Sequence, residues 1–110
     1  MEFTRHWEES LGRFFVLPEL EVLETESSLD FIDRHRNDLS VASYQAVLLL
    51  SENEWQSVPV FTVKGEPVVF YLDREEMHQS IAQCLEYFTG IEEYEKCAKL
   101  VKIKEIHCKD

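Results

Sequence analysis

Apolar residues recur with helical spacing near the start of the chain. In residues 4–15, Trp7 and Leu11 lie four positions apart, and Phe14 or Phe15 follows at similar spacing. This recurrence is typical of one face of an α-helix, which repeats about every 3.6 residues. We therefore predict that residues 4–15 form a helix with the aromatic side chains on one of its faces.

Two further helices are predicted later in the chain. One begins at Ser27 or Ser28, because a serine hydroxyl can accept a hydrogen bond from a free amide of the first helical turn. The other begins at Asp73 and ends at Gly90, and its apolar residues step about every four positions. They are Met77, Ile81, Leu85 and Phe88. This stripe predicts a helix that packs one face against the core.

Strands are predicted where short apolar stretches alternate with polar residues or lie between turn residues. They are residues 20–24, 44–50, 58–63, 68–72 and 100–106. The stretch 44–50 is mostly apolar, as in a strand buried on both faces. Gly65 lies between the third and fourth strands, where a positive φ angle would close a hairpin. The predicted fold is a single α+β domain over residues 1–110, with an antiparallel β-meander packed against helices, roughly in the order α-β-α-β-β-β-α-β.

The composition of the chain also indicates the cellular compartment in which it works. No apolar run approaches the roughly 20 residues that cross a bilayer, and the N-terminal stretch is acidic rather than basic and apolar. The three cysteines are odd in number and widely spaced, unlike the paired sets of small secreted domains. We therefore expect a cytoplasmic protein with reduced thiols and no membrane association.

Charge is the most informative global property of the chain. It has 22 acidic and 11 basic residues, which gives a formal net charge of −11. Residues 1–90 hold all of this excess, because the acidic and basic residues of 91–110 balance. Such a field repels nucleic acids and anionic membranes and attracts a basic partner, although acidity can also serve solubility alone. The predicted partner is therefore a basic protein rather than a nucleic acid.

The sequence has no recognisable catalytic, nucleotide or metal motif. With three glycines in the chain, a glycine-rich phosphate loop is nearly excluded. The four histidines fall in four different predicted elements, so they share no spacing suited to one metal ion. Cys84 lies beside the apolar stripe of its helix and is predicted to pack there rather than to act as a nucleophile. We expect no enzyme activity, no cofactor and no metal.

Acidic segments are the predicted partner-binding sites. In the first, Glu52 and Glu54 adjoin Trp55, and tryptophan is a frequent interface anchor. Carboxylates at this turn would pair with arginine or lysine on a basic partner. The alternative for Trp55 is that its ring folds back over the edge of the core. The second segment supplies Glu21, Glu24 and Glu26.

Several features of the chain occur together in one known family. Residues 7–11 (Trp-Glu-Glu-Ser-Leu) run into residues 14–18 (Phe-Phe-Val-Leu-Pro), and the helix after Ser28 and the β-meander follow. This plan resembles the small acidic immunity proteins of bacterial contact-dependent growth inhibition and related polymorphic toxin systems. The resemblance implies a cytoplasmic protein that binds a toxin domain, often a nuclease, and blocks its active site or substrate surface. It assigns no contact residue, because these proteins diverge to match their own toxins.

Two other functions fit the same observations. A phage-type or regulatory inhibitor would mimic nucleic acid with its carboxylates, although mimicry needs charge spread more evenly than an apolar meander permits. A small ligand-binding or enzyme subunit would need a pocket, which no pattern in the sequence reveals. The sequence identifies neither the partner nor the oligomeric state.

Overall fold

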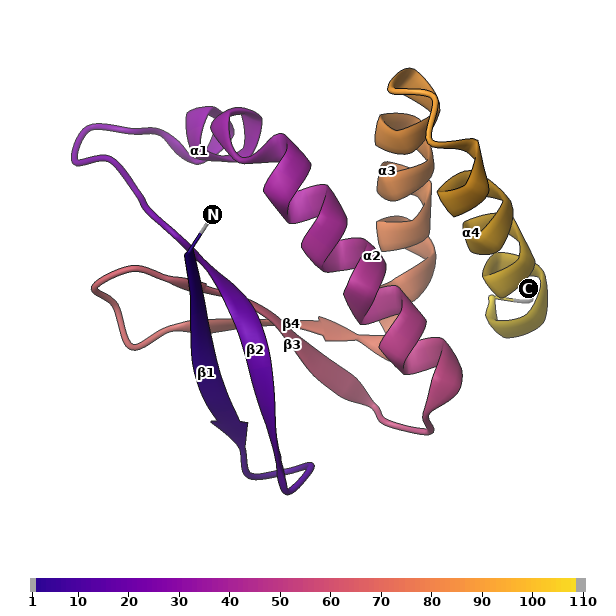
Figure 1. Ribbon diagram of the computed structural model, residues 1–110, viewed down its shortest axis with the longest axis horizontal. Helices are drawn as coiled ribbons and strands as arrows, with labels where there is room; N and C mark the ends of the chain where they lie inside the picture. Colours follow the sequence, from indigo (N-terminus) through magenta and orange to yellow (C-terminus); the bar gives the residue numbers. More distant parts are fainter. Residues whose placement is uncertain (1, 109–110) are drawn as a thin grey trace.

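The chain begins with a β-hairpin, so the helix predicted over residues 4–15 is wrong. In the computed structural model, which describes residues 2–108, strand β1 (Glu2–Glu8) pairs antiparallel with strand β2 (Arg13–Leu20) (Figure 1). Gly12 closes the turn with a φ angle of 63°, and its amide donates to a carbonyl at the end of β1 at 2.8 Å. The stretch is rich in aromatic residues, which favour strands, and its helical spacing is coincidental.

Two consecutive helices follow the hairpin. Helix α1 (Ser28–Arg34) starts where predicted, because the Ser27 hydroxyl accepts a hydrogen bond from the Asp30 amide at 3.1 Å. Helix α2 (Arg36–Glu52) includes residues 44–50, so the strand predicted there is wrong. This helix packs against both the sheet and a later helix. It is therefore apolar over much of its circumference, and such a sequence cannot be told from a buried strand by periodicity alone.

The second hairpin is confirmed, but the sheet is mixed. Strands β3 (Ser57–Val63) and β4 (Val69–Asp73) pair antiparallel around Gly65, whose φ angle is 81°, and a 3₁₀ turn, η1 (Arg74–Glu76), follows. The sheet order is β1-β2-β3-β4, and β2 runs parallel to β3. A helical crossover through α1 and α2 returns the chain in the same direction, which an antiparallel meander does not do. The predicted meander is therefore correct only for β3 and β4.

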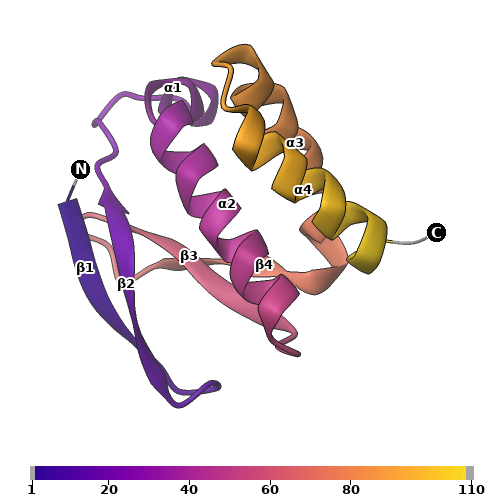
Figure 2. The same ribbon diagram turned by 45° about the vertical axis from the view of Figure 1, so that its right-hand side comes forward.

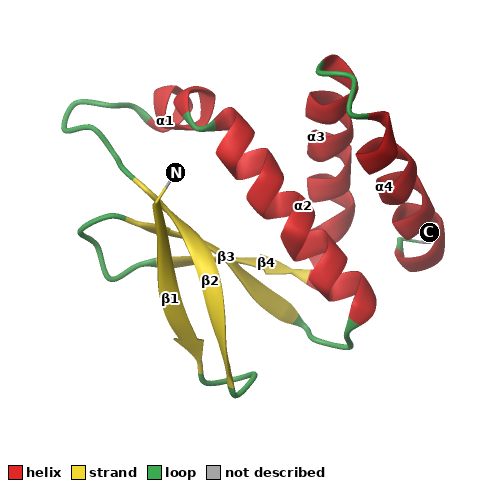
Figure 3. Ribbon diagram, viewed as in Figure 1, coloured by secondary structure: helices red, strands yellow, loops and turns green. Residues whose placement is uncertain are grey.

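The last described elements are helices, so the strand predicted over residues 100–106 is wrong. Helix α3 (Met77–Gly90) follows η1, and helix α4 (Tyr94–His107) packs on α3 (Figure 3). In α4, Leu100 and Ile103 are buried three positions apart, as on one face of a helix. Eight of the fourteen residues of α4 are lysine, glutamate, alanine or leucine, which are all good helix formers.

The helices lie together on one side of the sheet, with α2 nearest the strands (Figures 1 and 2). Buried side chains from both layers form one core cluster, to which α2 contributes Leu50, β3 contributes Val58 and α3 contributes Ile81. The observed order is ββααββαα, in a small α+β domain with a four-stranded mixed sheet. None of the helices within residues 2–108 is long and apolar enough to cross a membrane.

Candidate partner-binding surfaces

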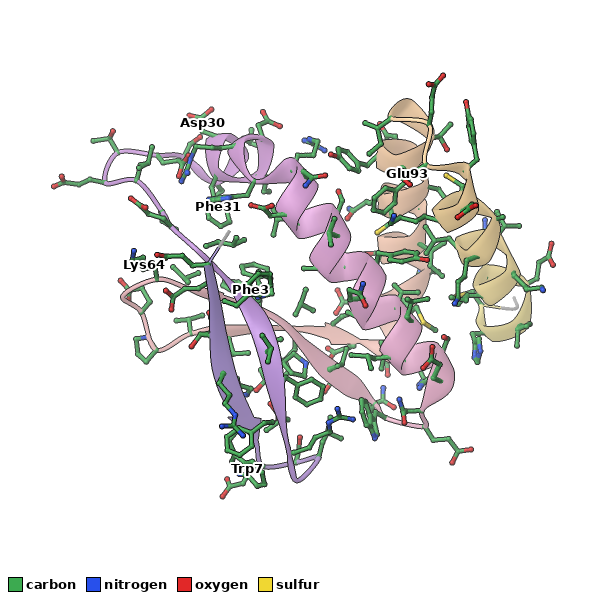
Figure 4. All side chains as sticks on the ribbon, viewed as in Figure 1. Phe3, Trp7, Asp30, Phe31, Lys64 and Glu93 are labelled. Carbon is green, nitrogen blue, oxygen red and sulfur yellow. The ribbon has the colours of Figure 1, made fainter. Side chains whose placement is uncertain are left out.

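Four large apolar side chains stand on one exposed face of the first hairpin. In the cross-strand register Trp7 lies beside Phe14, and Phe3 and Val16 belong to the same face. Their exposed fractions are 60% for Phe3, 49% for Trp7, 46% for Phe14 and 70% for Val16. Figure 4 shows Trp7 toward the tip of the hairpin and Phe3 at the other end of β1. Such contiguous apolar groups often mark an interaction site. We call these four residues the hairpin face.

Contacts within the hairpin face hold its rings in place. The guanidinium carbon of Arg5 lies 4.0 Å from the centre of the Phe14 ring. Trp7 meets the same ring edge-on, with 4.8 Å between the ring centres. Contacts of both kinds are worth roughly 0.5–1.5 kcal/mol and restrict the rings without burying them. A partner that covers the face therefore loses less affinity to the ordering of side chains.

The hairpin face continues into an apolar groove between β2 and α2. The groove holds about 140 Å³, with Phe3 and Val16 on the strand side and Val41 and Leu49 on the helix side. Asp38 also lines it. A carboxylate beside an apolar groove suits a partner segment that carries an apolar residue next to a basic one.

A buried carboxylate fixes the tip of the first hairpin to the rest of the domain. Glu8 accepts a hydrogen bond from the Tyr71 hydroxyl at 2.7 Å and one from the Ser10 hydroxyl at 2.7 Å. Its other contact is His6, whose Nε2 lies 2.8 Å from Glu8 Oε1. Burial alone would raise the pKa of Glu8, but the hydrogen bonds outweigh it and lower the pKa to about 2. Because Tyr71 belongs to β4, this network joins the two outer strands of the sheet.

The predicted acidic turn is exposed and lines a separate, polar surface. Glu52 ends α2 and Glu54 follows in the loop to β3, and both side chains are exposed. Together with Arg74 and His107 they line a shallow depression of about 570 Å³. No ion pair joins either carboxylate to another residue within 2–108. Both are therefore accessible to a basic group of a partner. We call Glu52 and Glu54 the acidic turn.

Arg74 holds the backbone of the acidic turn. Its guanidinium donates to the carbonyls of Leu50 and Asn53 at 2.7 and 2.6 Å. It also donates to the Trp55 carbonyl at 2.9 Å, and the Arg74 amide donates to the Gln56 carbonyl at 2.8 Å. The planar guanidinium presents its donors in a fixed fork, which suits several carbonyls of one loop. The acidic turn is therefore preorganised.

Trp55 lies along the edge of the core rather than out of the acidic turn. Its ring is partly buried against the core cluster and meets the Phe15 ring edge-on, with 6.0 Å between the ring centres. The Arg13 guanidinium carbon lies 5.6 Å from the centre of the Trp55 ring. The ring thus occupies the core-edge position, and its contact with a partner stays a prediction.

The second acidic segment lies at the other end of α2 from the acidic turn (Figure 1). Glu21 and Glu24 are exposed there. Glu26 instead accepts hydrogen bonds from Arg34 at 2.7 and 2.8 Å and from the Leu23 amide at 3.1 Å, which leaves its side chain 5% exposed. The hydrogen bonds from Arg34 lower the pKa of Glu26 to about 2. The two predicted acidic segments therefore do not form one surface, and Glu26 stabilises its own loop.

The hairpin face is not among the sites predicted from sequence, because a helix was expected there. Two signals in the sequence indicate it. Phe3 and Trp7 lie an even number of positions apart with polar residues between them, as on one face of a strand, and Gly12 is suited to a hairpin turn.

Comparison with protein-family models, with curated proteins and with solved structures gives no match. Within residues 2–108, no three side chains of His, Cys, Asp or Glu come together where they could hold a metal ion. The function is therefore inferred from the geometry and charge of these surfaces, together with the resemblance carried by the sequence.

Proposed function

We propose that the chain is a binding protein that docks a partner protein through the hairpin face. The observation that carries this proposal is the set of four apolar side chains, 46–70% exposed, on one face of β1 and β2. Aromatic residues and arginine are enriched among the few residues that supply most of the affinity in protein interfaces. The groove beside α2 offers an apolar side chain of the partner a place to insert.

The charge of the domain supports a basic partner. The net charge is −11, and all of the acidic excess lies in residues 1–90, which include the hairpin face, Asp38 and the acidic turn. A field of this sign speeds the encounter with a basic protein and disfavours acidic competitors. The acidic turn adds accessible carboxylates on a rigid loop, which suit lysine or arginine side chains of the partner.

We propose further that binding neutralises the partner, as in the immunity proteins that the sequence resembles. A toxin domain of the nuclease type would carry a basic groove for nucleic acid, and an acidic domain is complementary to such a groove. Support for this step comes from the net charge of the chain and from the resemblance. In this proposal the hairpin face supplies affinity, and the surrounding carboxylates supply the match to the basic groove.

Capture at low salt followed by elution with salt tests the proposal. The tagged chain is purified from the cells that make it, in parallel with the double variant Trp7→Ser, Phe14→Ser. We expect the original chain to retain a basic protein that elutes as salt is raised, and the double variant to retain at least about tenfold less of it. If the retained protein degrades nucleic acid, adding the original chain should stop the reaction.

The fold of the double variant has to be intact for this comparison. Trp7 and Phe14 are each about half exposed, so their replacement should lower the melting temperature by only a few degrees. Equal retention by the two chains would contradict docking through the hairpin face. A chain that retains no protein at low salt would contradict the binding function itself.

A further inference from the structure

An apolar cavity lies between the helices and the sheet, away from the hairpin face. It holds about 410 Å³ and is lined by residues of α1, α2, α3 and the second hairpin. Volumes of roughly 300–1,000 Å³ with mostly apolar walls are typical of small-molecule sites. Ser40, Ser43 and Gln83 are the neutral polar side chains on its wall. The cavity thus combines an apolar body with a few polar groups.

Three aromatic rings line one side of this cavity. Phe61 of β3 and Phe70 of β4 stack with 4.6 Å between ring centres and 8° between their planes. Phe31 extends from α1 toward the strands, and its ring centre lies 6.5 Å from that of Phe61 (Figure 4). Phe70 is 46% exposed, so part of its surface is accessible to a ligand. A planar aromatic group is therefore the apolar body that best matches the wall.

The charged group at this cavity is basic, although the domain as a whole is acidic. Of the ten lining residues in the described chain, Arg36 alone carries a formal charge. Burial raises the pKa of the Cys84 thiol to about 11, so Cys84 lines the cavity as a neutral group. Arg36 donates to Asp33 at 2.7 Å, but both side chains are more than half exposed, and such pairs are weak. The guanidinium keeps further donors for an anion.

We propose that this cavity binds a planar aromatic carboxylate. Its ring would stack on Phe70 beside Phe61, and its carboxylate would accept hydrogen bonds from Arg36. The two requirements are complementary, because the aromatic rings take the apolar body of the ligand and Arg36, the charged residue among the ten that line the cavity, takes its carboxylate. Binding of such a carboxylate is independent of docking at the hairpin face, since the two sites share no residue.

Titration with 2-naphthoate, followed by amide NMR shifts and calorimetry, tests the proposal. We expect saturable binding with a Kd below about 1 mM and shifts centred on residues 36–43, 61, 70 and 83–84. Arg36→Gln should weaken naphthoate binding roughly tenfold, which is the loss expected for a charge-assisted hydrogen bond. The uncharged analogue 2-naphthalenemethanol should bind Arg36→Gln and the original chain alike.

Two variants distinguish this cavity from other apolar surfaces. Ser43→Leu would fill the cavity and should abolish binding of both compounds, whereas Trp7→Ser on the hairpin face should change neither. Melting temperatures show whether each variant is folded. The proposal is overturned if naphthoate does not bind, if Arg36→Gln binds it unchanged, or if Trp7→Ser abolishes the binding. The last outcome would assign the aromatic affinity to the hairpin face.

Discussion

The hairpin face and the acidic turn are both exposed and both held rigid, yet they differ in the chemistry that they present to a partner. The hairpin face presents apolar area, with Phe3 and Val16 at 60% and 70% exposure. The acidic turn presents two carboxylates around a polar depression and little apolar area. Apolar area at the centre of an interface slows dissociation, whereas exposed charge mainly speeds association. If the proposed partner binds, we expect the hairpin face to supply most of the affinity and the acidic turn to raise the encounter rate.

The two surfaces are supported by different polar networks. Behind the hairpin face, Glu8 is buried and accepts hydrogen bonds from Tyr71 and Ser10. Behind the acidic turn, Arg74 donates to three loop carbonyls. A change on either surface should alter binding with little effect on folding. A change in either network should alter stability first.

The largest expected effect is on the hairpin face. Trp7→Ser with Phe14→Ser should weaken partner binding by about 100-fold or more, chiefly through faster dissociation, because each ring is a candidate anchor. Surface plasmon resonance with the captured partner measures both rates. Val101→Ser is the matched control, since Val101 is 43% exposed on α4, outside the proposed interface. An equal loss of affinity in the control would mean that the effect is not specific to the hairpin.

The next largest expected effect is the loss of stability when a hydrogen bond is removed from the network behind the hairpin face. Tyr71→Phe removes a 2.7 Å hydrogen bond from the buried Glu8 carboxylate, so the free energy of unfolding should fall by about 1–3 kcal/mol. Urea denaturation measures this change. Tyr94→Phe is the control, because Tyr94 is 61% exposed on α4 and should tolerate the same substitution. Equal stability of Tyr71→Phe and the original chain would contradict a structural role for the network.

The same network predicts how stability depends on pH. The pKa of Glu8 is lowered from 4.5 to about 2, so its contribution is present above pH 4.5 and is lost as the pH falls through about 2. The hydrogen bond to Glu8 raises the pKa of Tyr71 from 10.0 to about 12, so that contribution is present below pH 10 and is lost as the pH rises through about 12. Unfolding free energies measured across pH should show both losses.

Glu8→Gln isolates the acid limb of this pH profile. The pKa of Glu26 is also lowered to about 2, so part of the acid sensitivity belongs to the loop before α1. Glu8→Gln should be less stable at neutral pH and should lose less stability than the original chain between pH 4.5 and 2. Parallel profiles for the two chains would assign the acid sensitivity elsewhere.

Local signals in the sequence predicted some elements and misplaced others. Ser27 capped the helix as expected, and Gly65 closed the second hairpin, because each depends on a few adjacent residues. The strand predicted over residues 44–50 is wrong, because burial between the sheet and α3 makes a helix as uniformly apolar as a strand. In residues 100–106 lysine alternates with apolar residues as in an edge strand, yet the segment lies within helix α4, as the helix propensity of its lysines favours.

The site predictions likewise succeed where adjacent residues decide the outcome and fail where residues far apart in the chain make contact. The exposure of Glu52 and Glu54 follows from a polar turn, so the sequence could indicate it. That Trp55 packs beside Phe15 depends on a strand far away in the chain, and no local pattern specifies such a contact. The ion pair of Glu26 with Arg34 joins residues eight positions apart through a loop, so it too was not predictable. The aromatic residues of the hairpin face fit both a helical spacing and a strand alternation, so local pattern does not choose between a helix and a hairpin there.

The smallest expected effect concerns the acidic turn. It tests whether these two carboxylates, rather than the net charge of the whole domain, speed association with the partner. Glu52→Lys with Glu54→Lys should lower the association rate several-fold at low salt and hardly at all at high salt, because exposed charges are screened beyond about 10 Å at 0.1 M salt. Glu86→Lys with Glu105→Lys makes the same change in net charge on exposed positions of α3 and α4. If both pairs slow association equally, the whole field of the domain steers the partner and the acidic turn has no special part. If only the first pair does so, the basic surface of the partner passes close to the end of α2 as it docks on the hairpin face.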